Sequence, residues 1–331
     1  MATITSLAKD ERAARFVLAA ALEPDDSVTG RLLAAVGAVE TVRLAVSDDA
    51  MPRTVDPVEG ALWRGKVAPR LDSRIIERAR KETEQGRFDV LVPGDPYWPA
   101  GLSDLGHRAP AALWVSGAGS FLATKLCDSA TITGMRAATG YGEYVAREIA
   151  ADLAGAERVV VSGGGYGIDR AAHLAALEVD GPTIAVLSGG LNRLYPAGNR
   201  DLLERIGGLG LLVSELPPDA TPTRWRILAH DRIMAALSGA TVIVEAGYRS
   251  GSLNVAARAA QIGRPVGAVP GPVTSVASAG THRLLRDGIA SLVTQTDDLN
   301  RLLEGGNVPS RPSIESGVRP ARPTPRVGPS L

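Results

Sequence analysis

Short apolar segments alternate with longer helical segments from residue 87 to residue 304. The apolar segments are rich in Val, Ile and Leu, carry few charges and end in turn residues, mostly glycine. Nearly continuous apolar runs are typical of strands that are covered on both faces, as in a parallel sheet. Their alternation with helices predicts an α/β domain with a doubly wound, mostly parallel sheet. The expected strands are 89–94, 111–117, 129–134, 158–163, 183–189, 209–215, 240–246 and 265–271, and the expected helices between them are 140–155, 168–180, 197–207, 230–239 and 252–263.

The part of the chain before this domain has a helical pattern. Apolar residues recur at helical spacing over residues 9–49, with a break at Pro24-Asp25-Asp26. This pattern predicts a small helical module over residues 1–50. Residues 51–86 are expected to form a proline-containing linker, up to about residue 70, and then a charged helix over 72–86.

The last segment, residues 305–331, holds six Pro, four Arg and one Glu. It contains few large apolar side chains, so burial cannot offset the entropy that ordering would cost. We expect this segment to be disordered.

The whole chain carries 36 basic and 36 acidic residues, which gives a formal net charge of zero. Proteins that bind nucleic acid usually have a basic excess, so the net charge alone gives no support to such a partner. A local group of arginines beside a pocket needs no excess over the whole chain, however.

Cys127 is the only cysteine, which excludes an intrachain disulfide and a cysteine metal cluster. The apolar run near the N-terminus is too short and too charged to span a membrane. We therefore expect a cytoplasmic protein without membrane contact.

Four glycine-rich turns follow expected strands and are candidates for ligand contact. In doubly wound sheets, ligands bind beyond the carboxyl ends of the strands, where helix N-termini direct backbone N–H groups outward. Glycine opens the backbone to an anion, while a nearby arginine adds a cation and a tyrosine adds a stacking surface. Each turn has a purely structural alternative, namely a tight loop with a solvated arginine or an aromatic ring at the core edge. The turns are 133–136, 162–169, 188–199 and 249–253.

The second turn does not indicate a dinucleotide or a metal. Its glycine spacing differs from the dinucleotide fingerprint, and the next strand ends in Ser188-Gly189 without the acidic residue that binds a ribose. Asp169 and His173 share a helix face and could form an acid–base pair or bind a metal. Alternatively, Asp169 complements the helix N-terminus and His173 packs internally. No further metal-binding or catalytic motif accompanies them, so we expect no cofactor, no metal and no catalysis.

One helical segment, residues 224–238, interleaves three arginines with Trp225 and His230. Basic residues among aromatic ones suit a nucleic-acid backbone. An amphipathic helix with solvated arginines has the same pattern.

Several segments together resemble the DNA-processing protein A (DprA, also called Smf) family of bacterial recombination mediators. The resemblance extends from about residue 88 to about residue 295. The segments are SGGGYGIDRAAH (162–173), TIAVLSGGLNRLYPAGN (183–199), LLVSELPPDATPT (211–223), HDRIMAALSGATVIVEAGYRSGSLNVAARAA (230–260) and GRPVGAVPGPVTSVASAGTHRLLRDG (263–288).

The resemblance implies an extended Rossmann-like core that binds single-stranded DNA in a positively charged pocket. It further implies a homodimer that protects incoming DNA in natural transformation and helps to load a RecA-type recombinase, without a chemical reaction. The module at 1–50 is similar in place and pattern to the family's sterile-alpha-motif-like domain. We expect no counterpart of the winged-helix domain that often ends family members, because the Pro- and Arg-rich segment stands in its place.

The family's pocket motifs can be matched residue by residue. His230-Asp231 stand where the family usually has Arg-Asn. The expected nucleic-acid-binding residues are Gly134, Arg136, Ser162, Gly163, Gly167, Asp169, Gly189, Tyr195, Asn199, Arg232, Arg249, Ser250, Gly251 and Ser252.

A second function remains open from the sequence. A Rossmann-like core with glycine-rich loops also suits a sensor of free nucleotides or a nucleotide-processing enzyme. The loop type and downstream glutamate expected of nucleoside-phosphate-cleaving proteins are not found, which favours DNA binding. A third alternative, a scaffold that recruits a partner through the C-terminal segment, is supported by composition alone.

Overall fold

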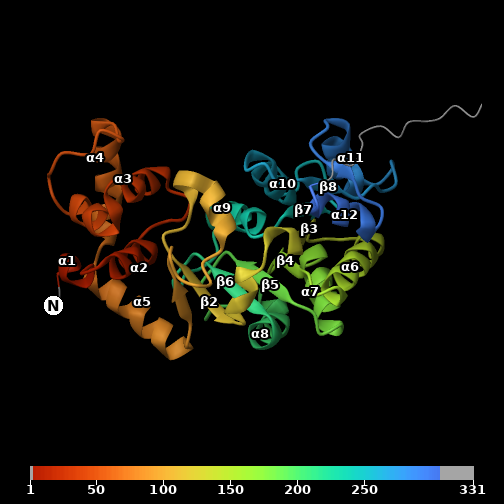
Figure 1. Cartoon of the computed structure of the whole chain (residues 1–331), viewed down its shortest axis with the longest axis horizontal. Coiled ribbons are helices and arrows are strands. Elements are labelled where there is room, and N and C mark those ends of the chain that lie inside the picture. Colours follow the sequence, from red (N-terminus) through yellow and green to blue (C-terminus); the bar gives the residue numbers. More distant parts are fainter. Residues whose placement is uncertain (1–2, 306–331) are drawn as a thin grey trace, which may run out of the picture.

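The computed structural model describes residues 3–305, so the segment expected to be disordered lies, from residue 306 on, outside the described residues. All eight expected strands are present, and the α/β architecture is confirmed. Figure 1 shows the sheet-containing core with helices α1 to α5 gathered at one end and α11 and α12 at the other. No helix within residues 3–305 is both long and apolar enough to cross a membrane.

The strands form one nine-stranded sheet in the order β1-β2-β6-β5-β4-β3-β7-β8-β9. β2 pairs antiparallel with β1 and with β6, and all other neighbours are parallel. The strands are β1 (Asp89–Leu91), β2 (Leu113–Gly117), β3 (Ser129–Thr133), β4 (Val159–Gly163), β5 (Thr183–Leu187), β6 (Leu211–Ser214), β7 (Ala240–Ile243), β8 (Val266–Ala268) and β9 (Ser291–Leu292).

The order in which strands are added reverses at β3. The chain adds β4, β5 and β6 on one side of β3, and then returns to add β7 and β8 on its other side. In doubly wound folds such a reversal leaves a crevice at the carboxyl ends of the strands, and ligands bind there. The topology therefore predicts a ligand site at the carboxyl ends of β3 and β7.

Helices cover both faces of the sheet. Successive side chains of a strand point to opposite faces, so Val160 packs with α6 and α7, whereas Val159 and Val161 pack on the side of α9. One face carries α6 (Gly140–Gly155), α7 (Ile168–Glu178), α8 (Arg200–Leu209) and α12 (Thr296–Leu303), and the other carries α9 (Arg224–Ala236), α10 (Ser252–Gln261) and α11 (Ala279–Arg286).

Aspartate caps begin most of the N-terminal helices. The side chain of Asp10 accepts a hydrogen bond from an N–H of α2, and Asp26 and Asp72 do the same for α3 and α5. Gly37 interrupts α3 with a φ of 78°, which is left-handed backbone that glycine adopts without strain. These helices are α1 (Ile4–Leu7), α2 (Glu11–Ala21), α3 (Ser27–Ala45), α4 (Pro57–Val67) and α5 (Ser73–Gly86).

Residues 57–67, expected to be part of a linker, form helix α4. Asp56 caps it and Pro57 occupies a first-turn position, where a missing N–H costs nothing. Trp63 is buried, and its indole N–H lies 2.9 Å from the hydroxyl of Thr29 and 3.1 Å from a carboxylate oxygen of Asp26. The segment is thus an integral part of the helical module.

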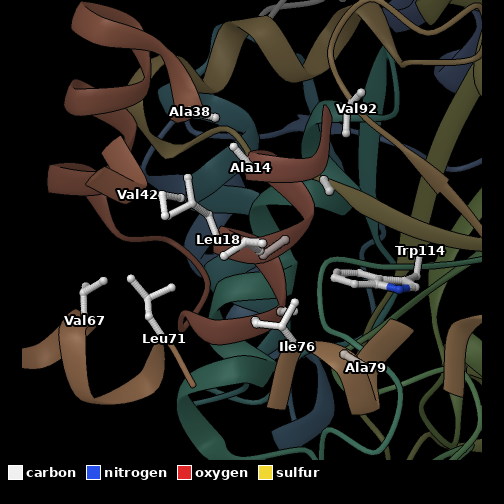
Figure 2. Close-up of a cluster of buried hydrophobic side chains, with 14 of the residues drawn as sticks. Ala14, Leu18, Ala38, Val42, Val67, Leu71, Ile76, Ala79, Val92 and Trp114 are labelled. Carbon is white, nitrogen blue, oxygen red and sulfur yellow. The ribbon is translucent and has the colours of Figure 1, made fainter. Parts of the chain in front are cut away.

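The helical module packs onto the edge of the sheet through a continuous apolar cluster (Figure 2). Leu18 and Ile76 converge there with Trp114 of β2, whose indole N–H donates to the hydroxyl of Thr83 in α5 at 3.0 Å. The ring of Phe16 lies 5.7 Å from that of Trp114. This shared core fixes the module against the α/β domain.

Candidate functional site

A cavity of about 890 Å³ opens at the carboxyl ends of β3, β4 and β5, beside the reversal of strand order. Its walls come from the loops after these strands, from the loop after β7 and from one face of α9. A volume of this size is typical of small-molecule and cofactor sites. The cavity therefore lies where the topology directs a ligand.

The cavity brings together residues from all four glycine-rich turns. Eight of the expected site residues line it, namely Gly134, Arg136, Asp169, Tyr195, Arg249, Ser250, Gly251 and Ser252. The other expected residues, Ser162, Gly163, Gly167, Gly189, Asn199 and Arg232, are not part of its lining.

Asp169 fixes the loop between β4 and α7. Its carboxylate accepts a hydrogen bond from the hydroxyl of Thr133 at 2.7 Å and another from the N–H of Gly165 at 3.2 Å. Burial raises the pKa of Asp169 above its usual range, although these hydrogen bonds act in the opposite direction. A Cβ at Gly163 or Gly165 would approach this carboxylate to 2.7 or 2.8 Å, so the close packing requires glycine.

Three of the expected residues shape the loops without reaching the cavity. Ser162 is fully buried and donates to the carbonyl of Ile132 at 2.6 Å. The amide of Asn199 donates to the carbonyls of Gly164 and Gly165, at 3.0 and 2.7 Å. The carbonyl of Gly189 accepts from the hydroxyl of Ser214. Their roles are structural support for the cavity wall.

Gly167 meets a strict steric requirement. Its φ is +69°, and a Cβ there would lie 2.5 Å from the carbonyl oxygens of Met135 and Arg136. The start of α7 therefore packs directly on the backbone of the first glycine-rich turn, which sets the position of Arg136.

His173 points into the protein, away from the cavity. Its ring nitrogens lie 2.8 Å from the hydroxyl of Thr183 and 3.0 Å from the carbonyl of Gly163. Burial lowers the pKa of His173 to about 4, so the ring is neutral near pH 7. The geometry favours the structural alternative for His173 over a role in catalysis or metal binding, and residues 3–305 contain no cluster of metal-binding side chains.

Arg232 requires a correction, because its side chain is only 1 % exposed and faces away from the cavity. Its guanidinium forms a bidentate pair with Glu215, with both N···O distances at 2.7 Å, and lies 3.4 Å from Asp25. It also donates to the carbonyl of Arg108. The phase of α9 explains this placement, since one side of the helix faces the cavity while the opposite side faces the helical module.

Two residues of α9 that the expected set omits, His230 and Asp231, do line the cavity. Asp231 accepts a hydrogen bond from the amide of Asn254 at 2.7 Å, which ties α9 to α10. Its other carboxylate oxygen lies 3.1 Å from Nδ1 of His230. Burial alone would lower the pKa of His230, but Asp231 and the carbonyl of Ile227 raise it overall. The interleaving of arginines with Trp225 and His230 in segment 224–238 was the sequence feature that indicated His230 as a candidate.

Three exposed arginines surround the mouth of the cavity: Arg136, Arg224 and Arg249. Within residues 3–305 none of them forms an ion pair, in contrast to the arginines on the opposite side of α9. Three unpaired guanidinium groups around one cavity create a positive local field, although the chain as a whole is neutral. Such a field favours a ligand with several negative charges.

The turn after β7 presents a helix end to the same cavity. Helix α10 begins at Ser252, with Gly251 as its cap and no side-chain cap. The hydroxyl of Ser250 lies 2.9 Å from that of Ser252. A Cβ at Gly251 would meet open space, and the helix N-terminus carries a partial positive charge. This end of the cavity is therefore also suited to an anion.

Comparison with known proteins identifies the family of this chain. The sequence model of the family described as DNA recombination-mediator protein A matches residues 89–304. A curated relative from Mycobacterium tuberculosis strain H37Rv, named a putative DNA processing protein DprA, is 47% identical over 272 residues, which cover 76% of this chain and 69% of the relative. The DNA processing protein DprA of Streptococcus pneumoniae is 36% identical over 224 residues, covering 68% of this chain and 77% of that protein.

Two solved structures are similar over nearly their whole length. An X-ray structure of DNA processing protein A from Streptococcus pneumoniae matches with a TM-score of 0.69 and 28% identity, covering 88% of this chain and 96% of that one. A structure of DNA processing protein A from Helicobacter pylori matches with a TM-score of 0.60 and 29% identity, covering 67% and 98%. The Helicobacter pylori protein is described as having a unique single-stranded DNA binding mode.

Proposed function

The chain belongs to the DNA recombination-mediator protein A family, and from that premise we propose that its cavity binds single-stranded DNA without a chemical reaction. The observation that carries the proposal is the set of three arginines, Arg136, Arg224 and Arg249, that line a cavity at the strand ends and form no ion pair within residues 3–305. A single strand supplies phosphates at regular intervals, which a fixed set of guanidinium groups can neutralise. The single-stranded DNA named for the Helicobacter pylori relative supports the same ligand class.

A base has a stacking surface at the same place. Tyr195 lines the cavity and leaves 45 % of its surface exposed. Stacking of a base on an aromatic ring contributes about 1–3 kcal/mol and is tolerant of sequence. Single-stranded DNA is preferred over a duplex in this proposal, because bases held in a duplex cannot reach the ring.

We extend the proposal to the biological role and the partners. The family supports a role in natural transformation, with a RecA-type recombinase as the protein that receives the bound strand. A homodimer is supported by Val273 and Val276, which lie between β8 and α11 and are 90 % and 83 % exposed, because large exposed apolar side chains are suited to association. A cytoplasmic location accompanies this role, since DNA and recombinase meet there.

The test is binding of a labelled oligo(dT) 30-mer, measured by fluorescence anisotropy beside a duplex of the same length. Wild type is expected to bind the single strand more tightly, and Arg136→Ala is expected to weaken binding. Arg205→Ala is the matched control, because Arg205 is an exposed arginine of α8 outside the cavity. Equal affinities of Arg136→Ala and Arg205→Ala would remove the cavity from the DNA-binding site.

A free nucleotide is the second candidate. Part of the cavity wall is apolar and includes Leu187, Ile227 and Met234. Such a wall suits an isolated base as well as a strand. Thermal-shift measurements with mononucleotides separate the two, because stabilisation by mononucleotides without oligo(dT) binding would favour the second candidate.

A further inference from the structure

His230 stands out among the residues that line the cavity, because it is a titratable group at the inner wall. Its side chain is only 15% exposed, yet it borders the cavity together with Asp169 and Arg136. The three arginines remain charged at every physiological pH. The charge of His230 can change near neutrality.

The two ring nitrogens of His230 have different surroundings. Nδ1 lies against the carbonyl of Ile227 and 3.1 Å from Asp231, so that side of the ring is fixed. Nε2 forms no hydrogen bond within residues 3–305. A Cβ built on Gly163, the last residue of β4, would lie 3.6 Å from Nε2 and 2.7 Å from the carboxylate of Asp169, so this nitrogen lies on the side of the ring near Asp169, which lines the cavity. The ring therefore directs a free nitrogen toward the cavity wall beside Asp169.

The charged groups around His230 come from several elements. Asp231 lies on the same helix, Asp169 comes from α7, Arg136 comes from the turn after β3, and Arg249 comes from the turn before α10. Asp231 and Asp169 favour the imidazolium form. The arginines oppose it until an anion occupies the space between them and the ring.

We propose that His230 is a phosphate-contacting residue of the cavity whose contribution depends on its protonation, with Nε2–H of the imidazolium donating to a phosphate oxygen. The inference rests on the proposed function for the identity of the ligand, because the phosphate is that of a bound single strand. Nδ1–H donates to the protein in the same state, so protonation adds a ligand contact and costs no internal one. The neutral ring, with its proton kept on Nδ1, presents a bare acceptor to the phosphate.

The sign of the pH dependence follows directly. The protonated form binds the anion more tightly, so affinity falls as pH rises through the pKa of His230, which lies above its ordinary value of 6.5. A charge-assisted hydrogen bond changes affinity by roughly tenfold or more. We therefore expect affinity for oligo(dT), whose phosphodiesters keep their charge over this range, to fall about tenfold between about pH 6 and about pH 8.5.

The experiment measures binding of an oligo(dT) 20-mer and of inorganic pyrophosphate over this pH range at constant ionic strength. His230→Gln is expected to bind both probes weakly and oligo(dT) without the pH dependence, and His230→Arg is expected to bind oligo(dT) tightly without it. His107→Gln is the matched control, since His107 is exposed and outside the cavity. It is expected to keep the wild-type profile.

The outcomes distinguish the role of His230 from the DNA-binding function. Oligo(dT) binding with a pH dependence that His230→Gln retains would overturn the role of His230 and leave the DNA-binding function intact. Failure of oligo(dT) to bind, with pyrophosphate binding that is weaker in His230→Gln than in wild type at the same pH, would overturn the DNA-binding function alone. Failure of both probes would overturn both.

Nuclear magnetic resonance of the wild-type protein gives a readout that does not depend on folding of a variant. The ring proton resonances of the four histidines are followed against pH with and without pyrophosphate. We expect the pKa of His230 to rise when pyrophosphate is bound. An unchanged titration of His230 would contradict the proposed contact.

Discussion

Replacing Arg232 with methionine is expected to destabilise the protein by about 3–5 kcal/mol while leaving the cavity lining in place. The side chain is 1 % exposed and connects α9 to the helical module and to the loop after β6. Methionine has a similar length and no charge. The change therefore removes the ionic contacts with little loss of volume.

The magnitude follows from what the substitution leaves behind. Glu215 loses both of its 2.7 Å hydrogen bonds, and its carboxylate is largely buried. Asp25, whose side chain is 1% exposed, retains Arg108 at 2.8 Å and Arg258 at 3.6 Å. The main cost is thus one buried carboxylate without its cation, which accounts for the figure of about 3–5 kcal/mol.

The assay is urea unfolding followed by circular dichroism, with Arg136→Met as the matched variant. Arg136 is exposed and unpaired within residues 3–305, so its loss is expected to change stability by less than about 0.5 kcal/mol. The order of the two variants is expected to reverse in DNA binding. Arg136→Met is expected to lower the affinity for oligo(dT) strongly, whereas Arg232→Met is not. If Arg232→Met were as stable as wild type and had lost oligo(dT) binding, the structural role would be refuted. Arg232 would then be a DNA-binding residue of the cavity.

Other consequences of the geometry can be checked separately. Gly167→Ala is expected to cost at least about 1–3 kcal/mol, because alanine is strained at this φ, and to weaken oligo(dT) binding by displacing Arg136; wild-type affinity in this variant would contradict the packing described. Burial of neutral His173 lowers its pKa to about 4, so stability is expected to fall by up to about 3 kcal/mol as pH drops from about 6.5 to about 4. His173→Gln is expected to lack this fall in stability at low pH. If the variant and the wild type showed the same pH profile of unfolding, His173 would not be the cause of the fall. Trp63→Phe removes the indole hydrogen bonds in the helical module and is expected to cost about 1–2 kcal/mol in thermal unfolding, whereas no loss would show that they contribute nothing.

The pattern of apolar runs predicted the sheet well, because β3 to β8 are buried along their whole length. β9 was not predicted, since its two residues, Ser291 and Leu292, are exposed or half-buried and carry no periodic signal. The sequence does not predict helix α4, because its few buried positions, such as Trp63, are separated by polar residues. Short elements of this kind are specified by tertiary contacts more than by local pattern.

The sequence predicted the candidate site only in part, because some of its residues are positioned by tertiary contacts. The glycine-rich turns are local in sequence, so their gathering at the strand ends follows from the fold alone. Which arginine of α9 faces the cavity depends on the rotation of that helix against the module, and the sequence contains no direct signal of it. Arg232, which was expected in the site, is therefore buried away from the cavity, whereas Arg224 and His230, which the expected set omits, line it.

The salt dependence of oligo(dT) binding tests the central claim most directly. Three phosphates neutralised by Arg136, Arg224 and Arg249 predict a slope of about −2 in log K against log salt concentration for a single strand. Replacing two of these arginines with alanine is expected to reduce the slope to about −0.7. A slope unchanged in the double variant would show that the strand binds elsewhere on the protein.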